Sequence, residues 1–179
     1  MRILITGGSG FLGQALTKTL LARGDEVLIL SRNPALEAKR KLGSRWVRSL
    51  DEIDAPVEAV FNLTGANLFS RPWTKARKRE LRDSRIAQTQ GLVDWLQRQM
   101  QAPRVLLSGS AIGFYGDQGE QELGEDSAQG EDWAATLVAD WEAATSGLAS
   151  RRILLRTGLV LGDGGLLQPL RPLFKCGLG

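Results

Sequence analysis

A glycine-rich turn between an apolar run and a helical pattern is the feature that most constrains the fold of this chain. The sequence opens MRILITGGSGFLG, with four glycines within seven residues after an apolar segment at 2–6. They fit two registers, Gly8-x-Gly10-x-x-Gly13 and Gly7-x-x-Gly10-x-x-Gly13. Glycine permits the tight turn, a close backbone approach to a pyrophosphate and close helix–strand packing, and the helix N-terminus offers free N–H donors. We predict a dinucleotide site with contacts from Gly7, Gly10, Phe11, Leu12 and Gly13; the alternative is a turn without a ligand.

Strand-like and helical segments alternate along the whole chain. Apolar patterns predict strands at 2–6, 26–30, 45–47, 59–63, 104–107 and 153–156. They predict helices at 11–23, 33–42, 73–99 and 131–146, the first with an apolar stripe of Leu12, Ala15, Leu16, Thr19 and Leu20. This alternation is typical of a parallel sheet covered on both faces. We therefore expect an α/β fold, a Rossmann-type doubly wound parallel sheet with strand order 3-2-1-4-5-6.

Composition excludes several kinds of site. The chain has no histidine and a single cysteine, Cys176. This excludes His-based catalysis, His metal ligands and a disulfide framework, and it argues against a structural zinc site. We expect no metal site. No apolar run approaches the length of a membrane-spanning helix, and Met1 leads directly into a strand. We expect a cytoplasmic protein without membrane contact.

Charge is distributed in two opposite patches. Residues 71–85 carry seven basic side chains against two acidic ones, and residues 117–132 carry seven acidic side chains and no basic ones. Apart from Trp73 near its start, the basic segment lacks interleaved aromatic residues, so we expect a solvated helix face and no nucleic-acid partner. The acidic segment is a long loop near strand ends, which favours a functional loop over a domain boundary.

The end of the second strand indicates which dinucleotide is bound. An NAD site places an acidic residue there to accept hydrogen bonds from the ribose hydroxyls. This chain has Ser31 and Arg32 instead. A guanidinium can form a charged fork with a 2′-phosphate, so we predict NADP(H), with Ser31 and Arg32 as contacts. An exposed arginine without a ligand is the alternative.

Four further segments recur together in one group of proteins. They are NLTGANL, DSRIAQTQGLV, LLSGSAIGFYGDQGE and LLRTGLVLGDGG. With the glycine turn, they make the chain similar to the atypical extended short-chain dehydrogenases of the epimerase family, related to nucleotide-sugar epimerases. The resemblance covers essentially all residues and implies a Rossmann domain with an NADP-type cofactor. In that arrangement the path from adenosine to nicotinamide is lined by Leu63, Thr64, Gly65 and Ala66.

The usual proton-transfer pair of short-chain dehydrogenases is absent. Most of these enzymes carry Tyr-x-x-x-Lys on a helix, where the lysine lowers the pKa of the tyrosine. The only tyrosine is Tyr115, and Gly119 follows four residues later. On the helix after the acidic loop, Ala134 and Val138 stand in the corresponding places.

The loop expected after the fifth strand supplies the remaining candidates for catalysis. By resemblance, Ser110 matches the serine that hydrogen-bonds the reacting oxygen, and Ser108 is its neighbour. Tyr115 matches a tyrosine that is common but not catalytic in extended enzymes. We take Ser110 and Tyr115 as the catalytic candidates. The alternative is that serine and glycine only shape this loop.

One arginine interrupts an apolar helix face. Leu81, Arg85, Thr89, Leu92 and Leu96 share one face of the predicted helix 73–99. A buried arginine is costly unless it reaches a partner or an anion. Arg85 is therefore either a ligand contact or an arginine that extends to the helix end.

We expect residues 1–166 to form an NADP(H)-binding Rossmann domain and residues 167–179 to begin a segment leading to a substrate domain. Relatives continue well beyond this point, so we expect a fragment that binds cofactor but turns over little by itself. The expected function is an oxidoreductase or epimerase-like activity on a small polar or nucleotide-sugar-like molecule. The alternative is a cofactor-sensing regulatory protein, for example one linked to cell division. The oligomeric state stays open.

Overall fold

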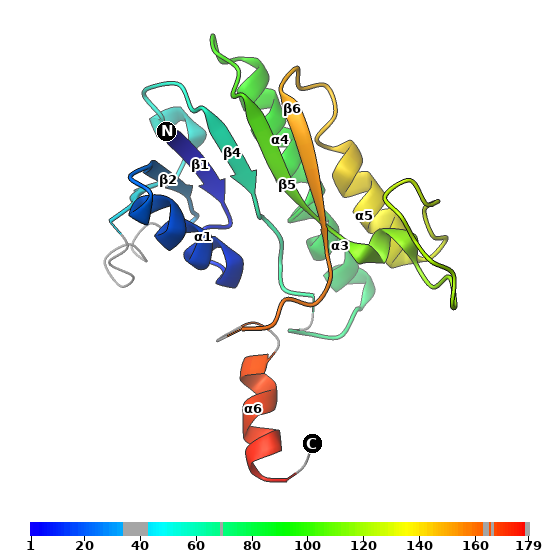
Figure 1. Cartoon of the computed structure of the whole chain (residues 1–179). Coiled ribbons are helices and arrows are strands. Elements are labelled where there is room, and N and C mark those ends of the chain that lie inside the picture. The colour runs from blue at the N-terminus through cyan, green and yellow to red at the C-terminus, as the bar shows by residue number, and fades with distance from the viewer. Residues whose placement is uncertain (34–42, 69, 163–164, 166, 178–179) are drawn as a thin grey trace.

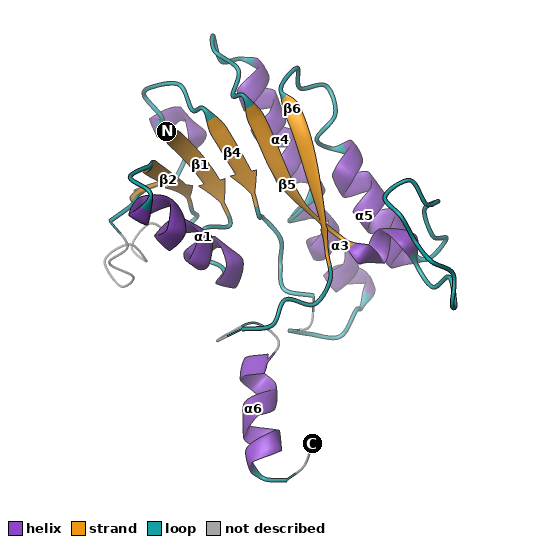
Figure 2. Ribbon diagram, in the orientation of Figure 1, coloured by secondary structure: helices purple, strands orange, loops and turns teal. Residues whose placement is uncertain are grey.

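In the computed structural model, residues 1–33, 43–68, 70–162, 165 and 167–177 are described. Within them, six parallel strands form one sheet in the order β3-β2-β1-β4-β5-β6, which confirms the predicted topology (Figure 2). The strands are β1 Arg2–Thr6, β2 Glu26–Leu30, β3 Arg45–Val47, β4 Ala59–Asn62, β5 Val105–Ala111 and β6 Arg151–Thr157.

Helices lie on both faces of this sheet (Figure 1). They are α1 Phe11–Ala22, α3 Lys75–Asp83, α4 Ile86–Gln97, α5 Trp133–Ala143 and α6 Leu167–Lys175, with short 3₁₀ turns η1 Leu50–Glu52 and η2 Ile112–Tyr115. Leu20 of α1 packs with Ile3 and Ile5 on one face. Leu92 and Leu96 of α4 pack with Leu4 on the other. Adjacent residues of β1 thus face opposite layers, as a doubly wound sheet requires.

Two expected details of α1 and β5 are wrong. Leu12 is 40% exposed, and the buried residues of α1 are Gly13, Thr17 and Leu20, because the helix approaches the sheet at a glycine. β5 continues to Ala111, so Ser108 and Ser110 lie in the strand and not in the loop after it. Pairing with β6 carries the strand through this Ser-Gly-Ser segment, in register Ser110 to Arg156. The predicted helix at 33–42 falls outside the described residues apart from Asn33.

The predicted helix at 73–99 is two helices. α3 ends with Ser84 as its C-cap, and α4 starts after Arg85. The Ser84 hydroxyl donates to the Leu81 carbonyl oxygen (3.0 Å) and accepts from the Ala66 N–H (3.0 Å). The break therefore occurs where the helix is tied to the loop after β4.

α6 extends away from the layered body in Figure 1, and residues 171–177 are exposed. Among the described helices, none combines the length and the apolar character needed to cross a bilayer.

Candidate functional site

The glycine turn has the geometry that only glycines allow. Gly7 adopts φ +72°, and a Cβ there would lie 2.4 Å from the Leu63 carbonyl oxygen. The Gly10 N–H donates to the Gly7 carbonyl oxygen over 3.0 Å and closes the turn. Of the two possible registers, Gly7-x-x-Gly10-x-x-Gly13 is thus the one that makes the turn.

Gly13 brings α1 into contact with this turn. A Cβ on Gly13 would lie 2.5 Å from both the Gly7 carbonyl oxygen and the Gly8 Cα. Gly10 is the N-cap of α1, no side chain caps it, and no acidic residue occupies the first turn. The first-turn N–H groups and the positive end of the helix dipole are therefore available to an anion. This cradle fits the pyrophosphate of a dinucleotide.

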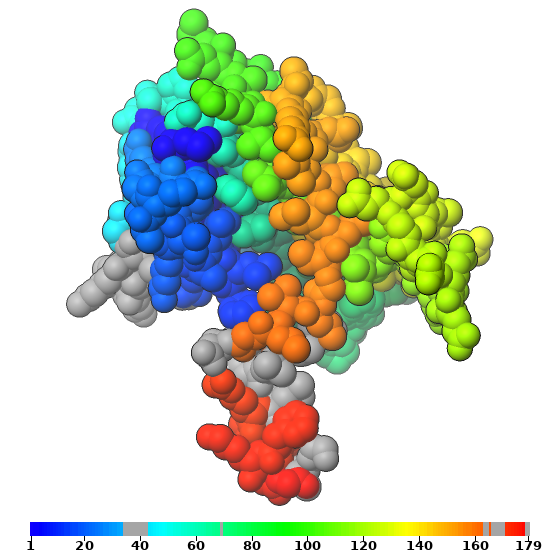
Figure 3. All heavy atoms as spheres, viewed as in Figure 1, coloured from blue at the N-terminus to red at the C-terminus, as the bar shows by residue number. Residues whose placement is uncertain are grey.

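Phe11 forms one wall beside the glycine turn. A Cβ on Gly162 would lie 2.8 Å from Phe11 Cζ, and one on Gly165 would lie 3.2 Å from Phe11 Cδ1. In Figure 3 the orange segment after β6 lies against the blue start of α1. The chain after β6 thus returns across the carboxyl edge of the sheet to the predicted pyrophosphate position.

The end of β2 presents Arg32 to solvent. The Ser31 N–H donates to the Val47 carbonyl oxygen (2.9 Å), and its hydroxyl accepts from the Asn33 N–H (3.2 Å). Arg32 is exposed, and no hydrogen bond or ion pair engages it within the described residues. Its guanidinium is free to meet a phosphate.

Arg85 lies beneath the loop that runs from Leu63 to Ala66. Arg85 is 8% exposed, and its guanidinium donates to the carbonyl oxygens of Ala66 (3.0 Å) and Leu81 (3.1 Å). It also lies over the Trp141 ring, 5.3 Å from its centroid. Burial, aided by repulsion from Arg77, lowers the pKa of Arg85 to about 10. Arg85 thus holds the loop from inside, and its side chain does not extend to the helix end.

Ser108 belongs to a buried hydrogen-bond network centred on Asn62. The Asn62 amide accepts from the Thr6 hydroxyl (2.7 Å) and donates to those of Thr89 (2.8 Å) and Ser108 (3.1 Å). Trp141 Nε1 adds a bond to Thr89 (3.1 Å). The network ties β1, β4, β5, α4 and α5 together below the carboxyl edge, and the Ser108 hydroxyl is occupied within it.

Ser110 is joined to a carboxylate that sequence reasoning did not identify. Its Oγ donates to Glu142 Oε1 over 2.5 Å, and both side chains are buried. Arg156 holds this carboxylate in turn, through Nε (2.8 Å) and Nη2 (2.9 Å). Burial opposes ionisation of Glu142, but the hydrogen bonds from Arg156 and Ser110 prevail and lower the pKa of its carboxyl.

Arg156 also connects the two catalytic candidates. Its Nη1 donates to the Tyr115 hydroxyl (2.9 Å) and to the Glu125 carbonyl oxygen (2.9 Å). The guanidinium lies over the Phe114 ring, 3.6 Å from the centroid. The hydrogen bond to Glu142 raises the pKa of Arg156. In the sequence, the signals that could have pointed to this pair are a charged residue in a largely apolar helix, Glu142, and one at the end of an apolar strand, Arg156.

This arrangement limits what Ser110 can do. Its hydrogen points to an ionised carboxylate, so its oxygen has lone pairs to offer a ligand and no hydrogen to donate. On α5, Val138 is buried and Ala134 is half-buried, and neither carries a titratable group. The described site contains a Ser–Glu–Arg–Tyr network in place of the usual Tyr–Lys pair.

Comparison with known proteins agrees with the fold and the glycine turn. Residues 3–155 match the model of the NAD dependent epimerase/dehydratase family. The chain is 38% identical to an epimerase family protein of Mycobacterium bovis, over 99% of this chain and 60% of that protein. The chain thus spans about three fifths of the length of the curated relatives it matches.

Solved structures give the same result. The human epimerase family protein SDR39U1, crystallised with NADPH, superposes with a TM-score of 0.88 at 33% identity, over 100% of this chain and 61% of that one. A nucleoside-diphosphate sugar epimerase from Corynebacterium glutamicum superposes with a TM-score of 0.77 at 32% identity, over 98% of this chain and 38% of that one. By its sequence and by its parallel sheet, this chain belongs to the NAD dependent epimerase/dehydratase family.

Proposed function

We propose that this chain is the NADP(H)-binding part of a cytoplasmic oxidoreductase or epimerase-like protein that acts on a small polar or nucleotide-sugar-like molecule. The observation that carries the proposal is the cradle of Gly7, Gly10 and Gly13, where backbone N–H groups at the start of α1 are open to a pyrophosphate. Residues 1–166 would form the cofactor domain, and residues 167–179 would lead toward a substrate domain.

Arg32 supports NADP(H) over NAD(H). It is exposed at the end of β2, where no carboxylate is present to accept from a ribose hydroxyl. SDR39U1, a relative in which NADPH is bound, agrees with this assignment. When bound, the nicotinamide would supply hydride exchange with a substrate carbon. In this proposal Ser31 and Arg32 hold the 2′-phosphate, and the loop from Leu63 to Ala66, supported by Arg85, lines the path to the nicotinamide.

Ser110 would be the residue nearest the substrate oxygen, with Tyr115 as part of its support. Because the Ser110 hydrogen is directed to Glu142, Ser110 would accept a hydrogen bond from a substrate hydroxyl. The missing Tyr–Lys pair also favours the second candidate function, a cofactor-sensing regulatory protein that binds NADP(H) without turnover.

Turnover assays separate the two functions when they use a longer chain that includes the proposed substrate domain, because we expect the present chain to turn over little by itself. NADPH with carbonyl substrates and NADP⁺ with alcohols would be followed by absorbance. Nucleotide sugars with either cofactor would be followed by chromatography of the sugar products, because epimerisation returns the cofactor to its starting state. Ser110→Ala and Tyr115→Phe would be assayed alongside. We expect Ser110→Ala to reduce any activity more than Tyr115→Phe does. NADPH binding without turnover across the panel would favour the regulatory function, and failure to bind NADPH would contradict both.

A further inference from the structure

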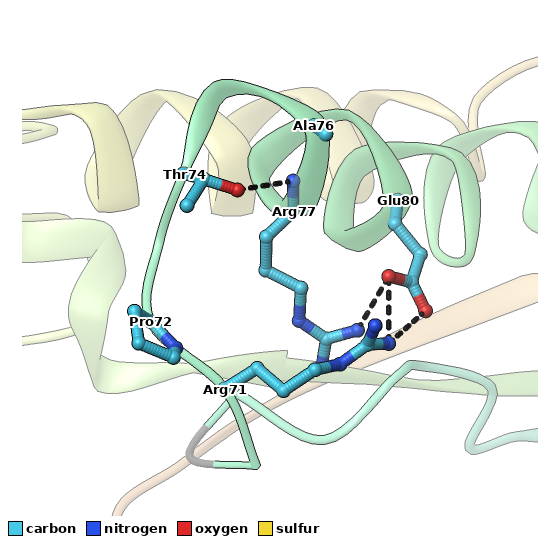
Figure 4. Close-up of a pocket in the computed structure, with 6 residues that line it drawn as sticks. All are labelled: Arg71, Pro72, Thr74, Ala76, Arg77 and Glu80. Carbon is cyan, nitrogen blue, oxygen red and sulfur yellow. Dashed lines mark hydrogen bonds and ion pairs between the residues drawn. The ribbon is translucent and has the colours of Figure 1, made fainter.

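A second concave site lies at the start of α3, distinct from the glycine turn. It encloses about 260 Å³ and is lined by Arg71, Pro72, Thr74, Ala76, Arg77 and Glu80 (Figure 4). A water molecule occupies about 30 Å³ of liquid, so this space has room for a phosphate or a diphosphate group. α3 follows the loop after β4, so the pocket lies toward the carboxyl edge of the sheet (Figure 1).

Arg77 is a fixed guanidinium in this pocket. Its side chain is only 5% exposed, and its Nη2 donates to the Asn67 carbonyl oxygen and to the Ser70 hydroxyl (3.0 Å). Its Nη1 pairs with Glu80 Oε2 over 2.8 Å, and its buried Nε has no hydrogen-bond partner. A guanidinium held in this way loses little conformational freedom when it binds an anion.

The pocket carries more positive than negative charge. Arg71 Nη2 donates to both oxygens of Glu80, at 3.0 and 2.9 Å, so one carboxylate lies between two guanidiniums (Figure 4). Within residues 71–82, Glu80 is the only acidic residue among six basic ones. Repulsion from Arg77 also contributes to the lowered pKa of Arg85, which agrees with an excess of positive charge here.

Further donors face the same space. Thr74 is the N-cap of α3, and its hydroxyl accepts from the Arg77 N–H over 3.2 Å, which leaves its hydrogen free. No acidic residue occupies the first turn of this nine-residue helix. The positive end of the helix dipole thus adds to the two guanidiniums.

We propose that this pocket binds the phosphate or diphosphate group of a small molecule between Arg71, Arg77 and Thr74, with Glu80 occupying the place of that group until it binds. The site does not depend on the cofactor assignment, because it shares no residue with the glycine turn. It extends the proposed function by assigning an anionic ligand to the edge of the sheet where a substrate is expected.

The test is a titration of the ¹⁵N-labelled chain with inorganic pyrophosphate, followed by amide chemical shifts, in the presence of saturating NADPH. We expect shifts at Thr74, Ala76 and Arg77 that saturate. Arg71→Gln, at a residue whose side chain is 63% exposed, should weaken binding roughly tenfold or more. Arg79→Gln removes the same charge from an exposed position outside the pocket and should change affinity less than about twofold. Glu80→Gln should tighten binding.

Three results would overturn the proposal: no saturable change of amide chemical shifts at the start of α3, equal losses of pyrophosphate affinity in Arg71→Gln and Arg79→Gln, or weaker binding by Glu80→Gln. Equal losses of affinity would indicate that a diffuse basic surface, and not this pocket, attracts the anion. Titration with uridine diphosphate identifies the source of the group, since binding tighter than that of pyrophosphate assigns it to a nucleotide. A chain that fails to bind NADPH but shows these shifts would contradict the cofactor proposal alone.

Discussion

Gly13 shows how a single missing side chain sets the distance between α1 and the glycine turn. In Gly13→Ala, the new methyl group would lie 2.5 Å from the Gly7 carbonyl oxygen and from the Gly8 Cα. Both are backbone atoms, so the helix must move. We expect the free energy of unfolding, measured in urea, to fall by about 1–3 kcal/mol, and NADPH affinity to fall with it.

Gly91→Ala is the matched control for this change. Gly91 is an exposed residue within α4, and a Cβ there has nothing within 4 Å. Alanine is favoured over glycine in a helix by about 1 kcal/mol, so this variant should be as stable as the parent or more so. If Gly13→Ala had the same free energy of unfolding as Gly91→Ala, the close contact at Gly13 would be contradicted.

Glu142 predicts a particular dependence of stability on pH. Its folded pKa is below the ordinary value of 4.5, so its stabilising contribution is present above that value and is lost as pH falls through the folded pKa. Glu142→Gln should lower the free energy of unfolding at pH 7 by roughly 1.5–3 kcal/mol. The difference between the two proteins should narrow below about pH 4.5.

Asp140→Asn makes the same chemical change two residues earlier on α5. Asp140 pairs with Arg82 at the surface, where both side chains are more than a third exposed. Such pairs contribute about 0–1 kcal/mol. A Glu142→Gln effect as small as that of Asp140→Asn, or one independent of pH, would argue against the buried network.

Among single residues, those with nearby contacts could be predicted from the sequence, and those with distant partners could not. The glycine turn could be predicted because the contacts among Gly7, Gly10 and Gly13 lie within seven residues of one another. Glu142 could not, since it meets Ser110 across 32 residues and Arg156 across 14. The three residues come together only through the pairing of β5 with β6 and the packing of α5 against β5.

At the scale of elements, the break between α3 and α4 could not be read from periodicity. Leu81 and Arg85 keep helical spacing, and both are buried as one continuous helix would predict. The break depends on Ser84 and Arg85 reaching Ala66 in a loop about 20 residues earlier. Likewise, the Ser-Gly-Ser end of β5 has weak strand propensity, and the neighbouring β6 determines its length.

Ser84→Ala tests this connection. It leaves the Ala66 N–H without its partner, so we expect a loss of about 1 kcal/mol in the free energy of unfolding. Amide hydrogen exchange at Ala66 should become faster. Ser146→Ala is the control, because the hydroxyl of Ser146, just beyond α5, donates only to the carbonyl oxygen of Ala143 at the end of that helix. Unchanged exchange at Ala66 in Ser84→Ala would show that the loop is held by Arg85 alone.

For the whole molecule, the alternation of strands and helices was enough to predict the sheet order, because parallel strands with right-handed crossovers permit few arrangements. All six strands lie where the pattern placed them to within a few residues at their ends. The central claim, that the carboxyl edge of this sheet holds NADP(H), concerns the whole molecule, since the glycine turn and Arg32 come from different strands.

The most direct test is calorimetric titration of this chain with NADPH and with NADH, repeated for Arg32→Asp. A charged fork to a phosphate contributes about 1.5–3 kcal/mol, or about ten- to a hundredfold in affinity. We predict that NADPH binds more tightly than NADH by that factor, and that Arg32→Asp removes the preference. Equal affinities of the unchanged chain for the two cofactors would contradict the account.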